Sequence, residues 1–110
     1  MKESIYKYKV VIELDDKKLD ADVIDVEDAY RVVKKMFADR GIKDISKGKH
    51  LVFVTNTGKG WSGIMANMTI IWKKWAKPYL KVMNLYDFEE DEVEDVIKTY
   101  TEVDEETEDI

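Results

Sequence analysis

Residues 5–14 read IYKYKVVIEL, a stretch in which apolar and charged side chains alternate. The apolar positions fall on one side of an extended chain: Tyr6, Tyr8, Val10, Ile12 and Leu14. The charged positions fall on the other side: Lys7, Lys9 and Glu13. A period of two residues is typical of a β-strand that buries one face. The stretch therefore predicts a half-buried strand.

The residues after this strand predict a hairpin. Asp15–Lys18 is a polar break of hairpin length, and after it Leu19, Ala21 and Val23 alternate with two aspartates. Short alternating runs joined by a tight polar turn form antiparallel pairs. We therefore expect a second strand over residues 19–23, antiparallel to the first.

Residues 25–41 carry the signals of an amphipathic helix. Asp25 is a suitable N-cap, and Glu27 and Asp28 place negative charge in the first turn, where the helix dipole favours it. Apolar residues then recur at helical spacing: Ala29, Val32, Val33, Met36 and Phe37. Gly41 is a good residue to end the helix, because glycine adopts the left-handed backbone conformation at low cost.

The middle of the chain predicts a strand, a loop, a helix and a strand. Residues 50–55 (HLVFVT) form a short apolar run typical of a buried central strand, and residues 56–63 (NTGKGWSG) are rich in turn formers. Residues 64–76 fit both helical and strand periodicity. We favour a helix, because Pro78 supplies a stop and 13 residues is long for a strand. Residues 79–86 then predict a further strand.

The end of the chain predicts one more helix. Asp87 and Glu90 have the spacing of a capping box. Apolar residues follow at helical spacing: Val93, Val96, Ile97 and Tyr100. Beyond about Glu102 no periodicity remains, so we expect one domain over residues 1–101 and an acidic, disordered tail over 102–110. The order ββαβαβα predicts a two-layer α+β fold with a mainly antiparallel sheet and about three helices.

Composition excludes several kinds of site. The chain has 110 residues, 38% of them charged, and no cysteine, which excludes disulfides, thiolate zinc sites and thiol catalysis. The first 14 residues have no uninterrupted apolar core of the kind a signal peptide needs, and charged residues interrupt the longest apolar stretch. We expect a cytoplasmic protein with no membrane partner.

Three features can be compared with known cofactor, metal or catalytic motifs. Residues 58–63 (GKGWSG) match the glycine pattern of dinucleotide-binding loops, but the chain is too short for two mononucleotide-binding halves, so a flexible loop is the simpler interpretation. His50 is the only histidine and has no neighbours at metal-ligand spacing. Ser62 lacks the nucleophile-elbow pattern. We therefore predict a non-enzymatic protein without cofactor or metal.

Charge is sorted along the chain. Residues 87–110 contain 13 acidic residues and one basic residue, whereas residues 40–86 contain nine basic residues and one acidic residue. In a helix, Glu90 with Glu94 and Asp91 with Asp95 would be like-charge neighbours that repel. A basic partner would explain why the sequence tolerates that repulsion, and this partner is either the chain's own basic block, over which the acidic end would fold back, or the nucleic-acid-binding groove of another protein. The predicted partner-binding set comprises the acids of residues 87–95: Asp87, Glu89, Glu90, Asp91, Glu92, Glu94 and Asp95.

The basic block offers an alternative. In residues 72–81, lysines that can contact phosphates are interleaved with aromatic residues that can stack on bases: Trp72, Lys73, Lys74, Trp75, Lys77, Tyr79 and Lys81. The same aromatic spacing also favours packing into the core, with the lysines in solvent. A small nucleic-acid-binding accessory protein and a homodimerising structural module therefore remain alternatives to an acidic docking protein.

The Lys-, Glu- and Asp-rich composition, the single proline and the lack of cysteine resemble the small acidic accessory proteins of phages and conjugative elements of low-GC Gram-positive bacteria. That class includes anti-CRISPR and anti-restriction proteins. The resemblance implies a compact α+β domain in the cytoplasm of a bacterial host cell. It also implies an acidic face that mimics nucleic acid and inhibits a defence nuclease, such as a CRISPR effector or a restriction enzyme, by binding its basic groove.

Overall fold

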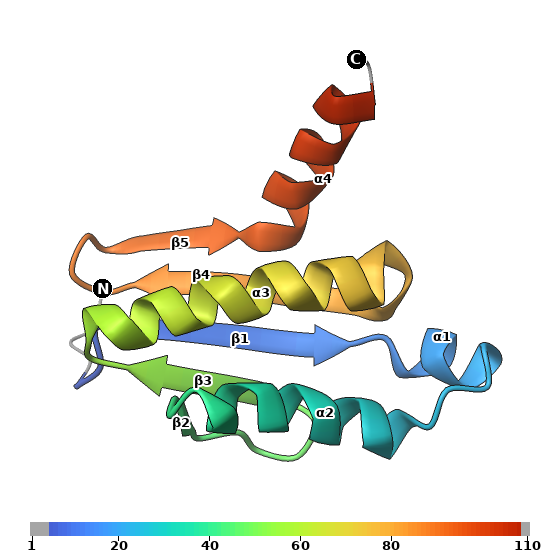
Figure 1. The fold of residues 1–110 in the computed structure, drawn as a ribbon, viewed down its shortest axis with the longest axis horizontal. Helices are drawn as coiled ribbons and strands as arrows, with labels where there is room; N and C mark the ends of the chain where they lie inside the picture. The colour runs from blue at the N-terminus through green and yellow to red at the C-terminus, as the bar shows by residue number, and fades with distance from the viewer. Residues whose placement is uncertain (1–4, 109–110) are drawn as a thin grey trace.

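The computed structural model describes residues 5–108, with the side chains of all of these except 75–77 and 104–108. The elements follow in this order: β1 (Tyr8–Leu14), α1 (Asp16–Ala21), α2 (Val26–Asp39), β2 (Lys43–Asp44), β3 (Leu51–Thr55), α3 (Gly58–Tyr79), β4 (Leu80–Asp87), β5 (Glu92–Asp95) and α4 (Val96–Glu108). Within the described residues, five strands form one antiparallel sheet in the order β2-β3-β1-β4-β5 (Figure 1). The predicted α+β class is confirmed, although the order of elements differs from the predicted one.

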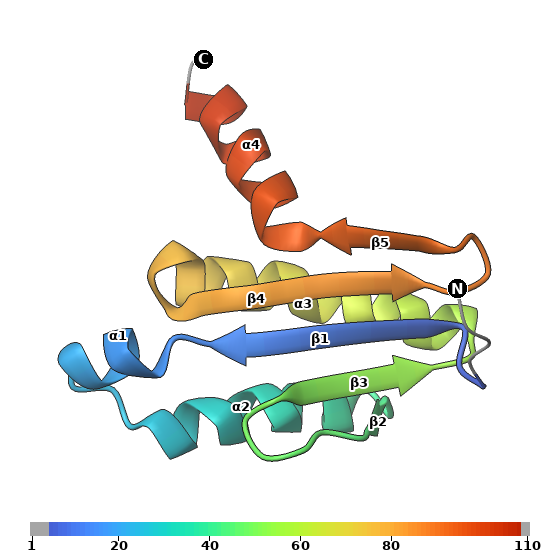
Figure 2. The same cartoon turned by 180° about the vertical axis from the view of Figure 1, so that it is seen from behind.

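Helices α2 and α3 lie across one face of the sheet, and no helix covers the opposite face of the sheet in the described residues (Figures 1 and 2). The central strand β1 pairs with β3 on one side and β4 on the other, which places Val10 between Phe53 and Leu85. The Phe37 ring of α2 stacks on Phe53 at a centroid distance of 4.0 Å, and both side chains are fully buried. The main core therefore lies between the sheet and these two helices.

The second predicted strand, over residues 19–23, is wrong. Residues 16–21 form the short helix α1, because the Asp15 side chain accepts a hydrogen bond from the Lys18 amide at 3.1 Å and caps the first turn. A strand would bury Leu19 and Val23 on the same face. In the structure Leu19 is fully buried, whereas Val23 is 92% exposed.

The helix predicted from Asp25 is confirmed as α2. The Asp25 carboxylate accepts from the Asp28 amide at 3.1 Å, and Gly41 has a φ of +72° just after the last turn. The strand predicted at residues 50–55 is also confirmed, as β3. Both segments combine a strong apolar pattern with clear end signals.

The loop predicted at residues 56–63 is wrong, since α3 already begins at Gly58. Thr57 caps it by accepting from the Gly60 amide at 2.9 Å. The glycines permit a close approach rather than a loop: a Cβ on Gly60 would overlap the Thr55 side chain, and one on Gly63 would lie 3.2 Å from Ile42 Cδ1. The helix predicted over residues 64–76 is confirmed, and it continues past the expected stop at Pro78 to Tyr79.

The helix predicted from Asp87 is wrong at its start. Residues 80–87 form the predicted strand, β4, but a tight turn and the edge strand β5 follow it. Helix α4 begins only at Val96, after Asp95 accepts a hydrogen bond from the Lys98 amide at 3.2 Å. It then points away from the sheet and continues to Glu108, beyond Glu102, where the sequence predicts a disordered tail (Figures 1 and 2). The last two residues of that tail lie outside the described residues.

None of the helices in residues 5–108 combines the length and the apolar composition needed to cross a bilayer.

The ends of α1 and α2 yield a stability prediction. Val23 occupies the same left-handed position after α1 (φ +60°) that Gly41 occupies after α2, and a β-branched residue is strained there. We expect Val23→Gly to raise the free energy of unfolding in urea by about 1 kcal/mol, because the strain is removed. Gly41→Val should lower it by about 1–2 kcal/mol, since a Cβ at Gly41 meets no neighbouring atom and only backbone strain is added. A lower stability of Val23→Gly would contradict the strained conformation.

Candidate functional site

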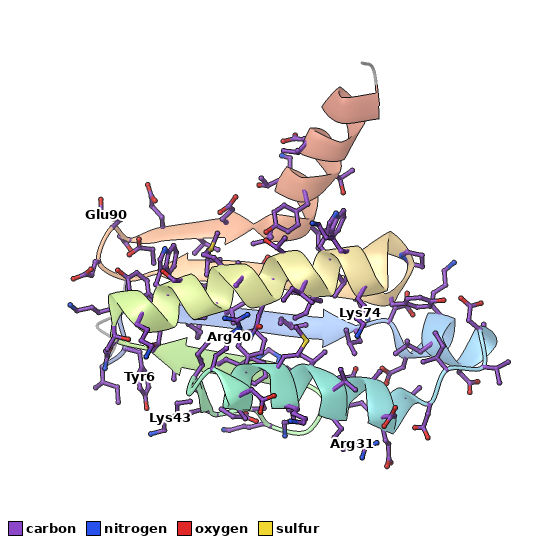
Figure 3. All side chains as sticks on the ribbon, in the orientation of Figure 1. Tyr6, Arg31, Arg40, Lys43, Lys74 and Glu90 are labelled. Atoms are coloured by element: carbon purple, nitrogen blue, oxygen red, sulfur yellow. The ribbon has the colours of Figure 1, made fainter. Side chains whose placement is uncertain are left out.

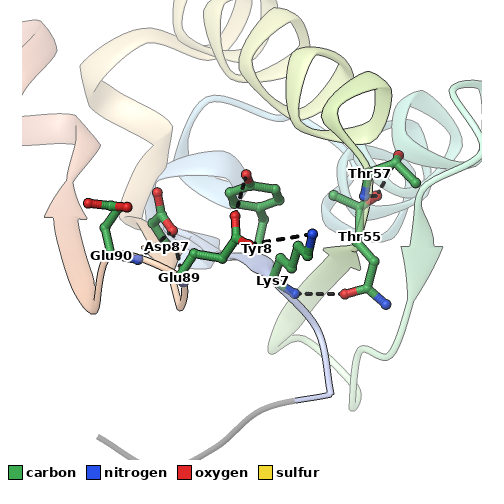
Figure 4. Close-up of polar contacts among 8 residues, drawn as sticks. Lys7, Tyr8, Thr55, Thr57, Asp87, Glu89 and Glu90 are labelled. Atoms are coloured by element: carbon green, nitrogen blue, oxygen red, sulfur yellow. Dashed lines mark hydrogen bonds and ion pairs between the residues drawn. The ribbon is translucent and has the colours of Figure 1, made fainter.

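The predicted partner-binding acids lie on the β4–β5 hairpin, residues 87–95, which we call the acidic hairpin. Its turn is ordered: one carboxylate oxygen of Asp87 accepts hydrogen bonds from the amides of Glu89 at 3.0 Å and Glu90 at 3.1 Å (Figure 4). Asp91 completes the turn with a φ of +54°, a conformation that aspartate tolerates better than most residues. The acids therefore project from a defined backbone.

The turn is also tied to the central strand. The Glu89 carboxylate lies 3.4 Å from the Lys7 ammonium and accepts a hydrogen bond from the Tyr8 hydroxyl at 3.3 Å (Figure 4). The Phe88 amide donates to the Lys7 carbonyl at 2.8 Å. Partial burial of the ring, followed by the nearby Glu89 charge, raises the pKa of Tyr8. The phenol thus stays protonated and remains a donor to Glu89.

Strand β5 carries two of the acids onto the helix-covered side of the sheet. Glu92 lies opposite Asp87, and Glu94 lies opposite Leu85. These residues line a cleft of about 160 Å³ together with two residues of α3, Trp61 and Met65. An apolar floor with carboxylates at its rim suits a lysine or arginine side chain, whose stem is apolar and whose end is charged.

The negative charge of the acidic hairpin is largely uncompensated. Among the described side chains, Glu89 is the only one of its seven acids in an ion pair. Glu90, Asp91 and Glu92 are exposed, and Glu90 lies at the outer end of the hairpin (Figure 3). The Glu94 carboxylate accepts a hydrogen bond from the Thr99 hydroxyl at 2.8 Å, and the Asp95 carboxylate accepts one from the Lys98 amide; both donors belong to α4.

The like-charge contacts differ from those that the sequence predicts. On a helix the close pairs would be Glu90 with Glu94 and Asp91 with Asp95. On the hairpin the directly opposed pair is Asp87 with Glu92, across β4 and β5. The structure thus places the predicted acids on one hairpin. The repulsion now acts between Asp87 and Glu92, because like charges opposite each other in a sheet are destabilising.

The alternative set in residues 72–81 does not form one face. Trp72 packs edge-on against Tyr100 of α4 with ring centroids 5.4 Å apart, and the Tyr79 hydroxyl donates a hydrogen bond to Asp22. Lys74 and Arg40 both line the groove between α2 and α3, at different points along it (Figure 3). Lys73 is exposed on α3, and Lys81 is exposed on β4. The side chains of Trp75 and Lys77 lie outside the described residues.

Four residues of this site carry no signal in the sequence that links them to the acids. The sequence pattern predicts only a strand at Lys7 and Tyr8, a loop at Trp61 and a helix at Met65. Only the pairing of β1 with β4 and the extension of α3 to Gly58 bring them to the acids. In the described part of the chain, no group of three or more histidine, aspartate or glutamate side chains could hold a metal ion.

No protein-family model, curated protein or solved structure matches this chain. Function is therefore inferred from the chemistry of the surface.

The opposed carboxylates yield a second prediction. Replacing Glu92 with Gln removes its repulsion from Asp87 and keeps the side-chain size. We expect the free energy of unfolding to rise by about 0.2–1 kcal/mol at low salt, and by less at 1 M salt, where the repulsion is screened.

Glu27→Gln is the matched control for this measurement. Glu27 is exposed in the first turn of α2, where the helix dipole favours a carboxylate, so the substitution should leave the stability unchanged or lower it slightly. Equal or lower stability of Glu92→Gln relative to wild type would show that the hairpin acids do not repel one another appreciably.

Proposed function

We propose that this protein is a non-enzymatic inhibitor, encoded by a mobile genetic element, that uses the acidic hairpin to occupy the basic nucleic-acid-binding groove of a bacterial defence nuclease. The supporting observation is that seven acids project from an ordered hairpin while only one of them, Glu89, has an ion-pair partner among the described side chains. Uncompensated charge on a fixed backbone lowers stability, so a basic partner gives a reason for its presence.

The acids form a short row along one edge of the sheet. Glu92 and Glu94 lie on the same face of β5, so their Cα atoms are about 6.7 Å apart along the strand. Arginine side chains bind carboxylates and phosphates with the same paired N–H geometry, so a groove that binds a phosphate backbone can bind this edge.

The nucleic-acid-binding alternative in residues 72–81 has weaker support. Base stacking requires accessible aromatic faces, whereas Trp72 packs on Tyr100 and Tyr79 is tied to Asp22. The three described lysines of the segment also lie on different elements or faces. The acidic hairpin is the more coherent surface of the two.

The proposal predicts competition with DNA. A guide-loaded CRISPR effector and a panel of restriction enzymes would be titrated with duplex DNA at increasing concentrations of the protein. For the target nuclease, the apparent Kd for DNA should rise with the concentration of the protein, and the effect should weaken steeply with salt.

The variant Glu90→Gln, Asp91→Asn, Glu92→Gln should lose at least about tenfold in inhibition, since charge-assisted contacts contribute about 1.5–3 kcal/mol each. Asparagine suits the left-handed backbone at position 91.

The matched control removes three exposed acids elsewhere: Asp20→Asn, Glu27→Gln, Glu102→Gln. Both triple variants change the formal net charge from −6 to −3. Retained inhibition by the control alongside weakened inhibition by the hairpin variant supports the proposal. Equal inhibition by both variants, or no competition with any nuclease, refutes it.

A further inference from the structure

A groove of about 490 Å³ lies between α2 and α3, the two helices that cover the sheet (Figure 3). Its apolar floor is accessible, since Ile70 is 41% exposed and Val32 and Met36 are half-buried. Both helices line the groove with residues at helical spacing: Val32, Met36, Asp39 and the adjoining Arg40 on the α2 side, and Asn67, Ile70 and Lys74 on the α3 side. The groove therefore combines an apolar floor with charged groups along its length.

Arg40, the residue that ends α2, is held in place by α3. Its Nε donates a hydrogen bond to Asn67 Oδ1 at 2.8 Å, and the Asn67 side-chain nitrogen donates to the Met36 carbonyl at 3.0 Å. Asn67 is only 1% exposed, so the amide that holds Arg40 cannot turn toward solvent. The Arg40 stem passes over Gly63, where a Cβ would lie 3.4 Å from Arg40 Cδ. These contacts fix the direction of the guanidinium and leave the donors on its two terminal nitrogens available to another group.

The groove carries uncompensated positive charge. Arg40 and Lys74 form no ion pair among the described side chains. The carboxylate that lines the groove, Asp39, accepts from the Lys35 ammonium through both oxygens, at 3.2 and 3.0 Å. Even with Asp39 counted as a full negative charge and Lys35 left out, two cations and one carboxylate give the lining a net charge of +1. A partner should therefore be negatively charged where it meets Arg40 and Lys74.

We propose that this groove binds an acidic amphipathic helix of another protein, with one carboxylate on Arg40 and a second near Lys74. Lys74 follows Asn67, which holds Arg40, by seven residues of α3, or about 10.5 Å along the helix. Carboxylates two turns apart on a docked helix have the same spacing, and apolar side chains between them reach the floor at Ile70. A guanidinium binds a carboxylate through two parallel N–H bonds, so the fixed Arg40 is the specific contact and the mobile Lys74 the adaptable one.

This inference does not rest on the proposed inhibitor function, because none of the residues that line the groove lines the cleft at the acidic hairpin. A purely structural tie between α2 and α3 also accounts for the bond from Arg40 to Asn67. It gives no role to the exposed Ile70 or to the positive charge of Lys74 in the same groove. The two interpretations differ in whether Arg40 and Lys74 both affect binding of an acidic helix.

The test is a titration of the ¹⁵N-labelled full-length protein with a designed, alanine-based helical peptide of about 16 residues, followed by amide chemical shifts. The peptide carries glutamate at positions i and i+7 and leucine at i+3 and i+4. We expect saturable shifts confined to residues 32–41 and 63–74. A peptide with lysine in place of both glutamates should bind at least about tenfold more weakly, since both charged contacts become repulsive.

Two substitutions test the charged contacts. Arg40→Lys keeps the positive charge but loses the paired N–H geometry and the bond to Asn67, so the Kd for the glutamate peptide should rise by about tenfold. Lys74→Glu reverses the second contact and should also raise the Kd by about tenfold. Arg31→Lys and Lys73→Glu are the matched controls, because they make the same changes at exposed positions of α2 and α3 that do not line the groove. Their Kd values should stay within about twofold of the wild-type value at physiological salt.

Equal binding of the two peptides overturns the proposal, and so does a failure to saturate at about 1 mM glutamate peptide. An equal loss of binding in the control variants and the groove variants overturns it as well. If Arg40→Lys lowers the melting temperature, Lys74→Glu decides the question, because the exposed Lys74 has no ion pair to lose among the described side chains. Shifts of the groove residues with protein concentration alone would assign the groove to a second copy of this chain instead.

Discussion

The pairing of β1 with both of its neighbours is the constraint on which the rest of the structure depends. Its register with β3 and β4 sets Val10 between Phe53 and Leu85, and so fixes which face of the sheet receives α2 and α3. A shift of one residue would turn the apolar row of β1 to the uncovered face. The same register brings Tyr8 beside Asp87 at one end of the sheet and Leu14 beside Leu80 at the other. The acidic hairpin is thus attached to one end of the central strand.

The parts of the fold that can be predicted from the sequence are those whose local pattern and long-range packing agree. Helix α2 has an N-cap, an apolar stripe and Gly41 at its end, so its local signals agree with its packing against the sheet. Residues 51–54 are all apolar, which agrees with a buried strand. Residues 19–23 and 87–95 lack that agreement. At or before the start of each segment lies an aspartate that can either cap a helix or hold a turn. Asp15 caps helix α1, and the burial of Leu19 favours that helix. Asp87 holds a turn instead, because β5 pairs with β4.

The candidate site is predictable to the same extent. The clustering of acids at residues 87–95 is a property of the sequence alone, so the set could be named without knowing its conformation. Its geometry could not, because the opposed pair Asp87 and Glu92 exists only in a hairpin. Trp61 could not be associated with these acids either, since three glycines make residues 58–63 look like a loop, whereas Gly60 serves to bring α3 close to Thr55.

The length of β1 explains why lysines at its far end, such as Lys49 and Lys81, do not neutralise the acidic hairpin. From Tyr8 to Leu14 the strand rises about 20 Å, at about 3.3 Å per residue. The Debye length at physiological ionic strength is about 8 Å, so exposed charges at the two ends barely attract each other through solvent. Among the described side chains, the acids of the hairpin pair with Lys7 alone and with no lysine of residues 40–86. The hairpin acids therefore keep their negative charge available to a cationic partner.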